Sequence, residues 1–420
     1  MYDYQIIRLL TSRDDIMKKE FLVTGANFMN KGAQAMLFVT VSELRRRYPG
    51  CGITMTTWER LGKIPYDFRY ISDSMLFDTV MNKEYSTTKK IRIFINACRE
   101  KNYELIRAFL YGIRFRRIDA VIDISGYQLS SQWGYQVSKN YIHRIAVARD
   151  NGVPLFIMPQ SISPFHYGSN QIEMDSLIKE YLSYPRIIYA REQSGYEVLT
   201  GEYGLKNVQK SVDLVLQNRS IDEKLLYRGK YQKRRYLQIT TDNNVAIIPN
   251  ARLFEQGCDD ERLLTLYRDI ILMLRRSGKN IYLVMHSAED LKICRLIRNQ
   301  LQDRHAVHIV KKDMDCLEFN QFIQRFDYVI GSRYHAIVHA YKNSVPCIVL
   351  GWADKYRELL KQFGQEKYMF DVRADIDQDA LLQSVVNMEN QWITEKKMIV
   401  SCLRKYQKEN CFDIVSLILN

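Results

Sequence analysis

The feature that most constrains the fold is a repeated alternation of short apolar segments with stretches of helical periodicity. Residues 20–25 form an apolar segment, and residues 32–47 carry apolar side chains at helical spacing. The same alternation continues through the first half of the chain, with further strands expected at 53–57, 120–124, 154–158 and 187–190. Alternating strands and helices predict a parallel sheet with helices on both faces.

The alternation stops in a polar, charged stretch and then begins again. Strands are expected at 245–249, 281–285, 307–310, 328–331 and 346–350, each followed by a helix. We therefore predict an α/β protein with two Rossmann-like domains facing a cleft, followed by C-terminal helices. The expected boundaries are 17–216 for the first domain, 217–240 for a linker, 241–375 for the second domain and 376–420 for the helical segment. Residues 1–16 are expected to be an extension or a loosely held arm outside the first domain.

Composition and the N-terminal sequence indicate where in the cell the protein is located. The 420 residues contain no apolar run near the ~18 residues of a transmembrane helix. The first fifteen residues include charged side chains and lack the apolar core of a signal peptide. No two of the eight cysteines are separated by only two residues, which disfavours a zinc knuckle. These features predict a cytoplasmic protein.

The net charge of +13 indicates anionic partners. Residues 81–118 hold ten basic side chains against three acidic ones, interleaved with apolar residues. Within this segment, residues 88–117 are either a helix with a solvated basic face or a basic amphipathic surface that meets a membrane or a membrane-bound acceptor. Known nucleic-acid-binding motifs are not found, so binding of nucleic acid is the least favoured interpretation.

The sharpest motif is Gly331-Ser332-Arg333-Tyr334-His335, which follows an apolar strand and opens a helix. Free N–H groups at a helix start attract anions, an arginine adds a bidentate donor, and a histidine can move protons near neutral pH. The alternative is an exposed arginine with a histidine that packs the helix. His339, four residues after His335, could pair with it on a metal, but no third ligand is visible nearby, so we predict no metal.

Two other loops follow strands in the first half. Arg191 follows the strand at 187–190 and opens the next helix, where it either serves as a surface or capping residue or joins Arg333 in gripping a doubly anionic ligand. The loop 25–33 lacks the glycine patterns of dinucleotide and P-loop sites. Its Asn27 and Asn30 are either ordinary turn residues or donors to a sugar or phosphate.

Together these motifs resemble the polysaccharide pyruvyltransferase family. The similar segments are Asn27 to Ala35, Pro159 to Phe165, Ala190 to Ser194, Asp213 with its neighbours, Gly331 to His335, and Gly351 to Tyr356. The resemblance covers roughly residues 21–370. Ser163 stands where the family usually has glycine, and Ala33-Gln34 where many members have an aspartate.

The resemblance implies a GT-B-like fold and transfer of pyruvate from phosphoenolpyruvate onto two hydroxyls of a sugar as a ketal. His335 would move protons, and Arg191 and Arg333 would stabilise the leaving phosphate. Ser332, Asn27, Asn30, Gln160 and Lys355 complete the implied substrate-binding set. No nucleotide, redox or metal cofactor is implied, and the acceptor would be a lipid-linked oligosaccharide. A GT-B glycosyltransferase that uses a nucleotide sugar is the alternative, because it would share the fold.

Overall fold

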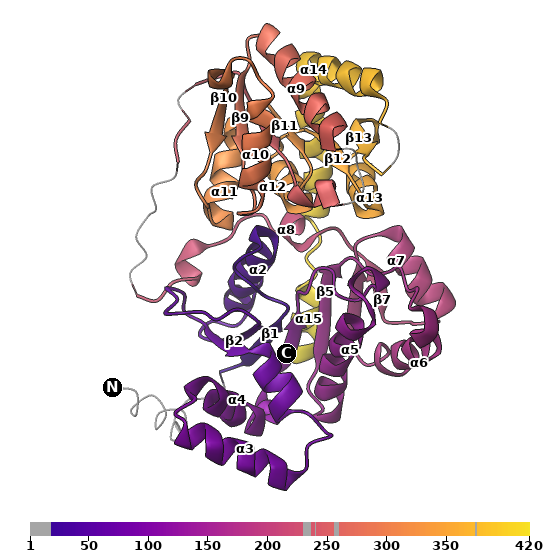
Figure 1. Cartoon of the computed structure of the whole chain (residues 1–420). Helices are drawn as coiled ribbons and strands as arrows, with labels where there is room; N and C mark the ends of the chain where they lie inside the picture. The colour runs from indigo at the N-terminus through magenta and orange to yellow at the C-terminus, as the bar shows by residue number, and fades with distance from the viewer. Residues whose placement is uncertain (1–17, 230–236, 240, 256–259, 374–375) are drawn as a thin grey trace.

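The computed structural model describes residues 18–229, 237–239, 241–255, 260–373 and 376–420. It has two lobes, each built on a parallel sheet with helices packed on both faces (Figure 1). The predicted fold class, two Rossmann-like units of α/β architecture followed by helices, is confirmed.

The N-terminal lobe is built on a seven-stranded sheet in the order β3-β2-β1-β4-β5-β6-β7, and its strand pairs are parallel. Its strands are β1 (Glu20–Thr24), β2 (Gly52–Thr57), β3 (Arg69–Ser72), β4 (Ala120–Asp123), β5 (Leu155–Gln160), β6 (Ile187–Ala190) and β7 (Val208–Lys210). Its helices are α2 (Lys31–Arg47), α3 (Thr87–Arg99), α4 (Tyr103–Ile113), α5 (Tyr135–Asp150), α6 (Gln171–Tyr181), α7 (Gln193–Glu197) and α8 (Leu214–Gln217).

The C-terminal lobe is built on a six-stranded parallel sheet in the order β10-β9-β8-β11-β12-β13. Its strands are β8 (Asn244–Ile248), β9 (Asn280–Val284), β10 (Val307–Val310), β11 (Tyr328–Gly331), β12 (Cys347–Gly351) and β13 (Met369–Asp371). Its helices are α9 (Asp260–Arg276), α10 (Asp290–Asn299), α11 (Cys316–Phe322), α12 (Tyr334–Lys342), α13 (Asp354–Gln362) and α14 (Gln378–Tyr406), and the chain ends in α15 (Asp413–Leu419).

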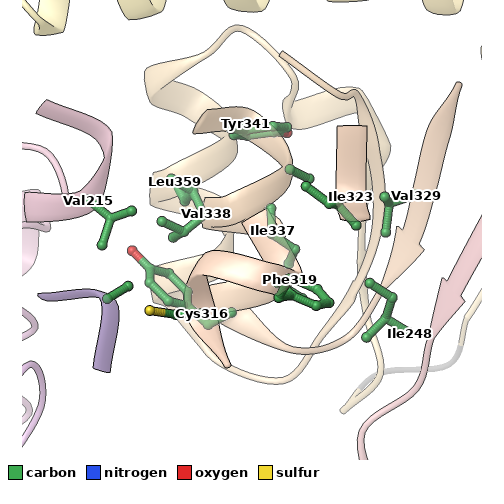
Figure 2. Packing of buried hydrophobic residues seen from close by; sticks show 14 of the residues in the cluster. Val215, Ile248, Cys316, Phe319, Ile323, Val329, Ile337, Val338, Tyr341 and Leu359 are labelled. Carbon is green, nitrogen blue, oxygen red and sulfur yellow. The ribbon is translucent and has the colours of Figure 1, made fainter. Parts of the chain in front are cut away.

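One apolar core runs through both lobes. The C-terminal sheet and its helices share a continuous cluster of buried side chains with α2 and α8 of the N-terminal lobe. Figure 2 shows Val215 of α8 facing Val338 of α12 across the boundary between the lobes. A second cluster lies on the other face of the N-terminal sheet. A buried apolar interface of this kind holds the two lobes in one relative position.

The last helix, α15, returns to the N-terminal lobe (Figure 1). The Arg47 guanidinium pairs with the Asp413 carboxylate at 2.6 Å, and the Lys19 ammonium donates to the carbonyl of Leu419 at 3.2 Å. Buried Phe412 and Val415 join the core between these polar contacts. The end of the chain is therefore part of the packing of the first lobe.

The domain boundaries stay predictions. The predicted linker, 217–240, includes residues 230–236 and 240, which lie outside the described residues. The predicted arm, 1–16, also lies outside them.

Candidate active site

The loop after β1 docks the N-terminal lobe onto the C-terminal lobe. Asn30 caps α2, because its side-chain oxygen accepts from the Gly32 N–H at 2.8 Å, and the Asn27 oxygen accepts from the Asn30 N–H at 2.9 Å. The two asparagines that the sequence suggested for substrate binding therefore shape the turn with these oxygens. Their position at the carboxyl edge of the sheet keeps them beside the junction of the lobes.

The residues that follow in α2 bind the C-terminal lobe directly. Buried Lys31 donates to the carbonyl of His286 at 2.6 Å and to the carboxylate of Asp313 at 2.9 Å. The Gln34 side-chain oxygen accepts from the Cys316 N–H at the start of α11 at 2.7 Å. The segment that resembles the first family motif is thus a contact between the lobes.

Gly32 lies directly against the ring of His335. A Cβ atom built at Gly32 would stand 2.0 Å from Cγ and 2.2 Å from Cδ2 and Nδ1 of that ring. Only a residue without a side chain permits this approach. The contact places His335, at the start of α12, on the boundary between the lobes.

His335 is held in its neutral form at this boundary. Burial, together with the positive charges of Arg191 and Lys355, lowers the pKa of His335 well below its usual range. Its Nε2 is buried and has no hydrogen-bond partner among the described residues. A neutral imidazole with a free ring nitrogen can accept a proton from a ligand hydroxyl.

Arg191 reaches the same boundary from the N-terminal lobe. Its guanidinium pairs with Asp213 and donates to the Gly126 carbonyl at 2.8 Å and the Ser161 hydroxyl at 2.7 Å. These contacts fix its direction, and its buried Nε has no hydrogen-bond partner among the described residues, although the Glu192 carboxylate lies 3.9 Å away. Its carbon Cζ lies 5.0 Å from the ring centre of Tyr334.

Lys355 completes the group from the first turn of α13, which follows β12. Its ammonium lies 4.8 Å from the ring centre of Tyr127, 5.3 Å from that of Trp352 and 5.4 Å from that of Tyr334. In the described part of the chain, no carboxylate forms an ion pair with it. Burial, and secondarily the charge of Arg191, lowers the pKa of Lys355 to about 8. We call Arg191, Tyr127, Tyr334, His335 and Lys355 the interlobe cluster.

Arg333 and Ser332 lie beside the cluster with their polar groups engaged. Arg333 donates from Nε to both carboxylate oxygens of Asp290, at 3.0 and 3.2 Å, and its Nη2 pairs with Glu289 at 2.5 Å. The Ser332 hydroxyl lies 3.1 Å from the buried Tyr267 hydroxyl. The carboxylate partners of Arg333, Asp290 and Glu289, lie at the start of α10, 43 and 44 residues earlier, so its local sequence gave no sign of them.

Gln160 belongs to a buried polar network beneath the cluster that the sequence did not reveal. Its amide nitrogen donates to the Tyr141 hydroxyl at 2.7 Å, and that hydroxyl donates to Asp123 at 3.2 Å. The Thr24 and Ser125 hydroxyls also donate to Asp123, at 2.7 and 2.8 Å. Burial nevertheless raises the pKa of Asp123. The position of Asp123 at the end of an apolar strand was the only hint of this network in the sequence. Its partners Thr24, Tyr141 and Gln160 belong to three other elements, β1, α5 and β5.

The chain matches the polysaccharide pyruvyl transferase family over residues 30–354, more than half its length. It belongs to that family. A polysaccharide pyruvyl transferase is a transferase enzyme, and the family implies a polysaccharide acceptor. The matched range contains the interlobe cluster up to Tyr334 and His335 and ends one residue before Lys355. Among curated proteins, none matches the chain.

Solved structures agree on the fold of this pyruvyl transferase family member. The chain is similar to Medicago truncatula UGT71G1 complexed with UDP-glucose, with a TM-score of 0.54, 11% identity, and coverage of 96% of this chain and 99% of that one. It is also similar to UDP-GlcNAc 2-epimerase from Methanocaldococcus jannaschii, with a TM-score of 0.50, 13% identity, and coverage of 89% and 93%. The corresponding Neisseria meningitidis epimerase gives a TM-score of 0.50, 11% identity, and coverage of 96% and 100%. At these identities the likeness shows the GT-B fold alone.

The substrate-binding and catalytic roles of the candidate residues stay predictions. The structure brings Arg191, His335 and Lys355 into one cluster, and places Arg333 next to it in an ion-pair network. Tyr127 and Tyr334 were not singled out from the sequence, because tyrosine is frequent in this chain, with 28 copies, and neither has a distinctive spacing.

Proposed function

We propose that this transferase moves pyruvate from phosphoenolpyruvate onto two hydroxyls of a sugar as a ketal. The observation that supports the proposal is the interlobe cluster, in which Arg191 Nε and His335 Nε2 are buried without hydrogen-bond partners beside the ammonium of Lys355, which forms no ion pair among the described residues. Phosphoenolpyruvate carries a carboxylate and a phosphate on a three-carbon frame. Two cations held close together suit these two anionic groups, because a desolvated ammonium such as that of Lys355 needs a partner of opposite sign.

The reaction requires one proton donor and one proton acceptor. The first sugar hydroxyl bonds to C2 of phosphoenolpyruvate while C3 takes up a proton and becomes the methyl group. The C2–O bond to phosphate then breaks, the second hydroxyl bonds to C2, and its proton leaves with the phosphate. The sum is one ketal and one inorganic phosphate, without oxidation or reduction.

The charged residues of the cluster and His335 have roles in these steps. Neutral His335 accepts the proton of the attacking hydroxyl and, as the imidazolium, passes it to C3. Arg191 and Lys355, with Arg333 nearby, stabilise the negative charge that gathers on the departing phosphate. The buried position between the lobes strengthens these interactions, because water screens charges weakly there.

The test is phosphate release from phosphoenolpyruvate with a panel of synthetic and lipid-linked sugars. Arg191→Ala, Arg333→Ala and His335→Ala are each expected to lower turnover at least tens-fold, since loss of one such contact costs about 2–4 kcal/mol in the transition state. Ile172→Ala, an exposed position on α6, is the control and is expected to keep full turnover. Normal turnover of His335→Ala would remove that residue from the mechanism.

Thermal stability distinguishes the proposed function from the alternative, a GT-B glycosyltransferase with a nucleotide sugar. If the proposed function is right, phosphoenolpyruvate is expected to raise the melting temperature of the chain, because a ligand that binds the folded state stabilises it. Protection by UDP-sugars without protection by phosphoenolpyruvate would favour the glycosyltransferase.

We propose further that the acceptor is lipid-linked and that helices α3 and α4 meet the cytoplasmic face of the membrane. These helices lie at the end of the N-terminal lobe that is remote from the C-terminal lobe (Figure 1). Phe94 and Phe109 pack together between them, whereas Ile91, Ile95 and Ile113 stay exposed. No helix in the described ranges is long and apolar enough to cross a membrane.

The charge of this helical pair supports contact with an anionic surface. In and around the two helices, one basic side chain, Lys83, pairs with Asp150. The others form no ion pairs among the described residues; they are Lys89, Lys90, Arg92, Arg99, Lys101, Arg107, Arg114, Arg116 and Arg117. Each basic side chain near such a surface contributes about 1 kcal/mol.

Sedimentation with liposomes tests the contact. The wild-type chain is expected to bind vesicles with anionic lipid, to bind less at high salt and to ignore neutral vesicles. Reversal of Arg114, Arg116 and Arg117 to glutamate is expected to abolish binding and to spare turnover of a water-soluble acceptor. Equal binding by the triple variant would leave the basic face as a merely solvated one.

A further inference from the structure

A cavity of about 250 Å³ opens at the carboxyl ends of β2 and β3, on the edge of the N-terminal sheet. Helix α4 closes one side with Glu104 and Arg107, and the segment after β2 contributes Trp58 and Arg60. This is the edge of the sheet at which parallel α/β folds bind ligands. None of the lining residues belongs to the interlobe cluster.

Two aromatic side chains give the cavity apolar walls. Trp58 is 67% exposed, which is unusual for the largest apolar side chain. Tyr70 is held by donation of its hydroxyl to the Leu61 carbonyl, and the Arg107 guanidinium carbon lies 5.8 Å from its ring centre. An exposed aromatic face next to a fixed one is a typical ligand platform.

Polar groups in the cavity are free to bind. Within the described ranges, neither the Glu104 carboxylate nor the Arg60 guanidinium forms a hydrogen bond or ion pair, and Arg107 forms no ion pair there but lies near the ring of Tyr70. The carboxylates of Glu59 and Glu104 and the guanidiniums of Arg60 and Arg107 balance in formal charge. Aromatic faces with balanced charges suit a neutral polyhydroxyl ligand better than a phosphate, which the carboxylates would repel.

The cavity is tied to the loop that positions His335. Glu59, another lining residue, accepts from the N–H groups of Phe28 and Met29 at 2.8 and 2.7 Å. Gly32, which touches His335, follows three residues after Met29, so the two Cα atoms are at most about 11 Å apart. The backbone from Met29 to Gly32 therefore joins the wall of the cavity to the residue that touches His335.

We propose that this cavity, the Trp58 pocket, binds a sugar unit of the acceptor that neighbours the unit receiving pyruvate. The C–H face of the sugar would lie on Trp58, and its hydroxyls would bond to Glu104 and Arg60. The cavity volume, about 250 Å³, falls just below the ~300–1,000 Å³ typical of pockets for drug-sized ligands, as expected for a smaller ligand such as one sugar unit. This inference rests on the proposed function, since it assumes that the acceptor is a saccharide.

Binding is tested first without the reaction. The full chain, labelled with ¹⁵N-tryptophan, is titrated with methyl glycosides of glucose, galactose and mannose and with N-acetylglucosamine. Trp58→Phe assigns the indole signal. At least one sugar is expected to shift the Trp58 signal in a saturable way, and Glu104→Gln is expected to weaken that shift. If none of the four sugars shifts the signal, the pocket proposal is overturned.

Kinetics then separate the pocket from the catalytic site. With β-linked disaccharide acceptors, Trp58→Ala is expected to lower kcat/KM for the acceptor about tenfold, a loss of ~1.4 kcal/mol, and to leave the KM for phosphoenolpyruvate unchanged. Trp58→Phe is expected to retain most of the activity, and Ile172→Ala all of it. With monosaccharide acceptors Trp58→Ala is expected to match the wild type, because the pocket is then empty.

The two proposals fail in different ways. If the wild type releases phosphate but Trp58→Ala treats both acceptor lengths as the wild type does, the pocket proposal is wrong and the proposed function stands. If the wild type releases no phosphate with any acceptor, the proposed function fails, and the indole titration alone decides the pocket.

Discussion

Replacement of Gly32 by alanine would add a methyl group where α2 of the N-terminal lobe touches the His335 ring of the C-terminal lobe. The new Cβ would stand 2.0–2.2 Å from three atoms of the His335 ring, whereas real Cβ contacts essentially never fall below 3.0 Å. Gly32 lies in the first turn of α2, and His335 in the first turn of α12. Because both backbones belong to packed helices, the ring or the whole lobe must move.

The expected cost follows from two opposing effects. Alanine is favoured over glycine inside a helix by about 1 kcal/mol, so Gly32→Ala should stabilise the chain if nothing stood in the way. Overpacking of a filled interior costs about 1–3 kcal/mol. We therefore expect a net loss of up to ~2 kcal/mol. A ring displaced by an ångström can lower turnover about a hundredfold, so activity is expected to fall further than stability.

The assay combines thermal denaturation with phosphate release in four proteins: wild type, Gly32→Ala, His335→Ala and the double variant. Gly32→Ala is expected to lower the melting temperature in the wild-type background and to raise it slightly in the His335→Ala background, where the ring is gone. Turnover stays low in all three variants. Gly201→Ala is the matched control: Gly201 lies in the helical segment Val198–Glu202 and a Cβ there meets no atom within 4 Å, so the melting temperature should rise slightly.

A change in melting temperature that reverses its sign between the two backgrounds identifies the ring of His335 as the cause of the destabilisation. A destabilisation by Gly32→Ala of the same size in both backgrounds would mean that the ring of His335 is not what the new methyl group meets. Wild-type stability and turnover in the single variant would refute the close approach altogether.

Two further predictions concern the charge of Lys355 and the backbone strain at Ser163. The pKa of Lys355 is lowered from 10.5 to about 8, so its charge is lost as the pH rises through that value. We therefore expect kcat/KM for phosphoenolpyruvate to decline above about pH 8, and Lys355→Arg, which stays protonated, should abolish the decline. Between those two pKa values the unfolded chain binds the extra proton, so this group's contribution to the free energy of unfolding rises with pH, the opposite of the trend in activity. Ser163 has a φ of +87°, where an L-residue is strained, so Ser163→Gly is expected to raise the melting temperature; a fall would show that the serine side chain contributes more than the strain costs.

The sequence predicted the interior of both sheets well and their edges poorly. Central strands such as β1 and β11 are largely buried and contain continuous apolar runs, which the pattern detects. Of the four edge strands, β10 was predicted, whereas β3, β7 and β13 were missed. They stand at sheet edges, have three or four residues and are partly exposed, so their sequences are mixed and short.

The same division holds for the candidate site. Arg191, His335 and Lys355 could be chosen because each follows an apolar strand in a motif. The contacts that orient them could not, because Asp213 reaches Arg191 from another strand end and Tyr127 approaches Lys355 from the other lobe. Ser163 shows a partial success: the sequence marked it as a departure from a family glycine, and its positive φ supplies the physical reason why glycine is usual there.

The return of α15 to the first lobe sets an order of events during synthesis. The surface formed by Glu43, Arg47 and Tyr48 stays uncovered until the ribosome has made the segment around Asp413, because that segment supplies its partners. Domains usually fold as units from the N-terminus onward. Here the first lobe to emerge is the last to be finished, so a nascent or truncated chain exposes the surface that Phe412 and Val415 cover in the full chain, and chaperones and proteases can recognise it.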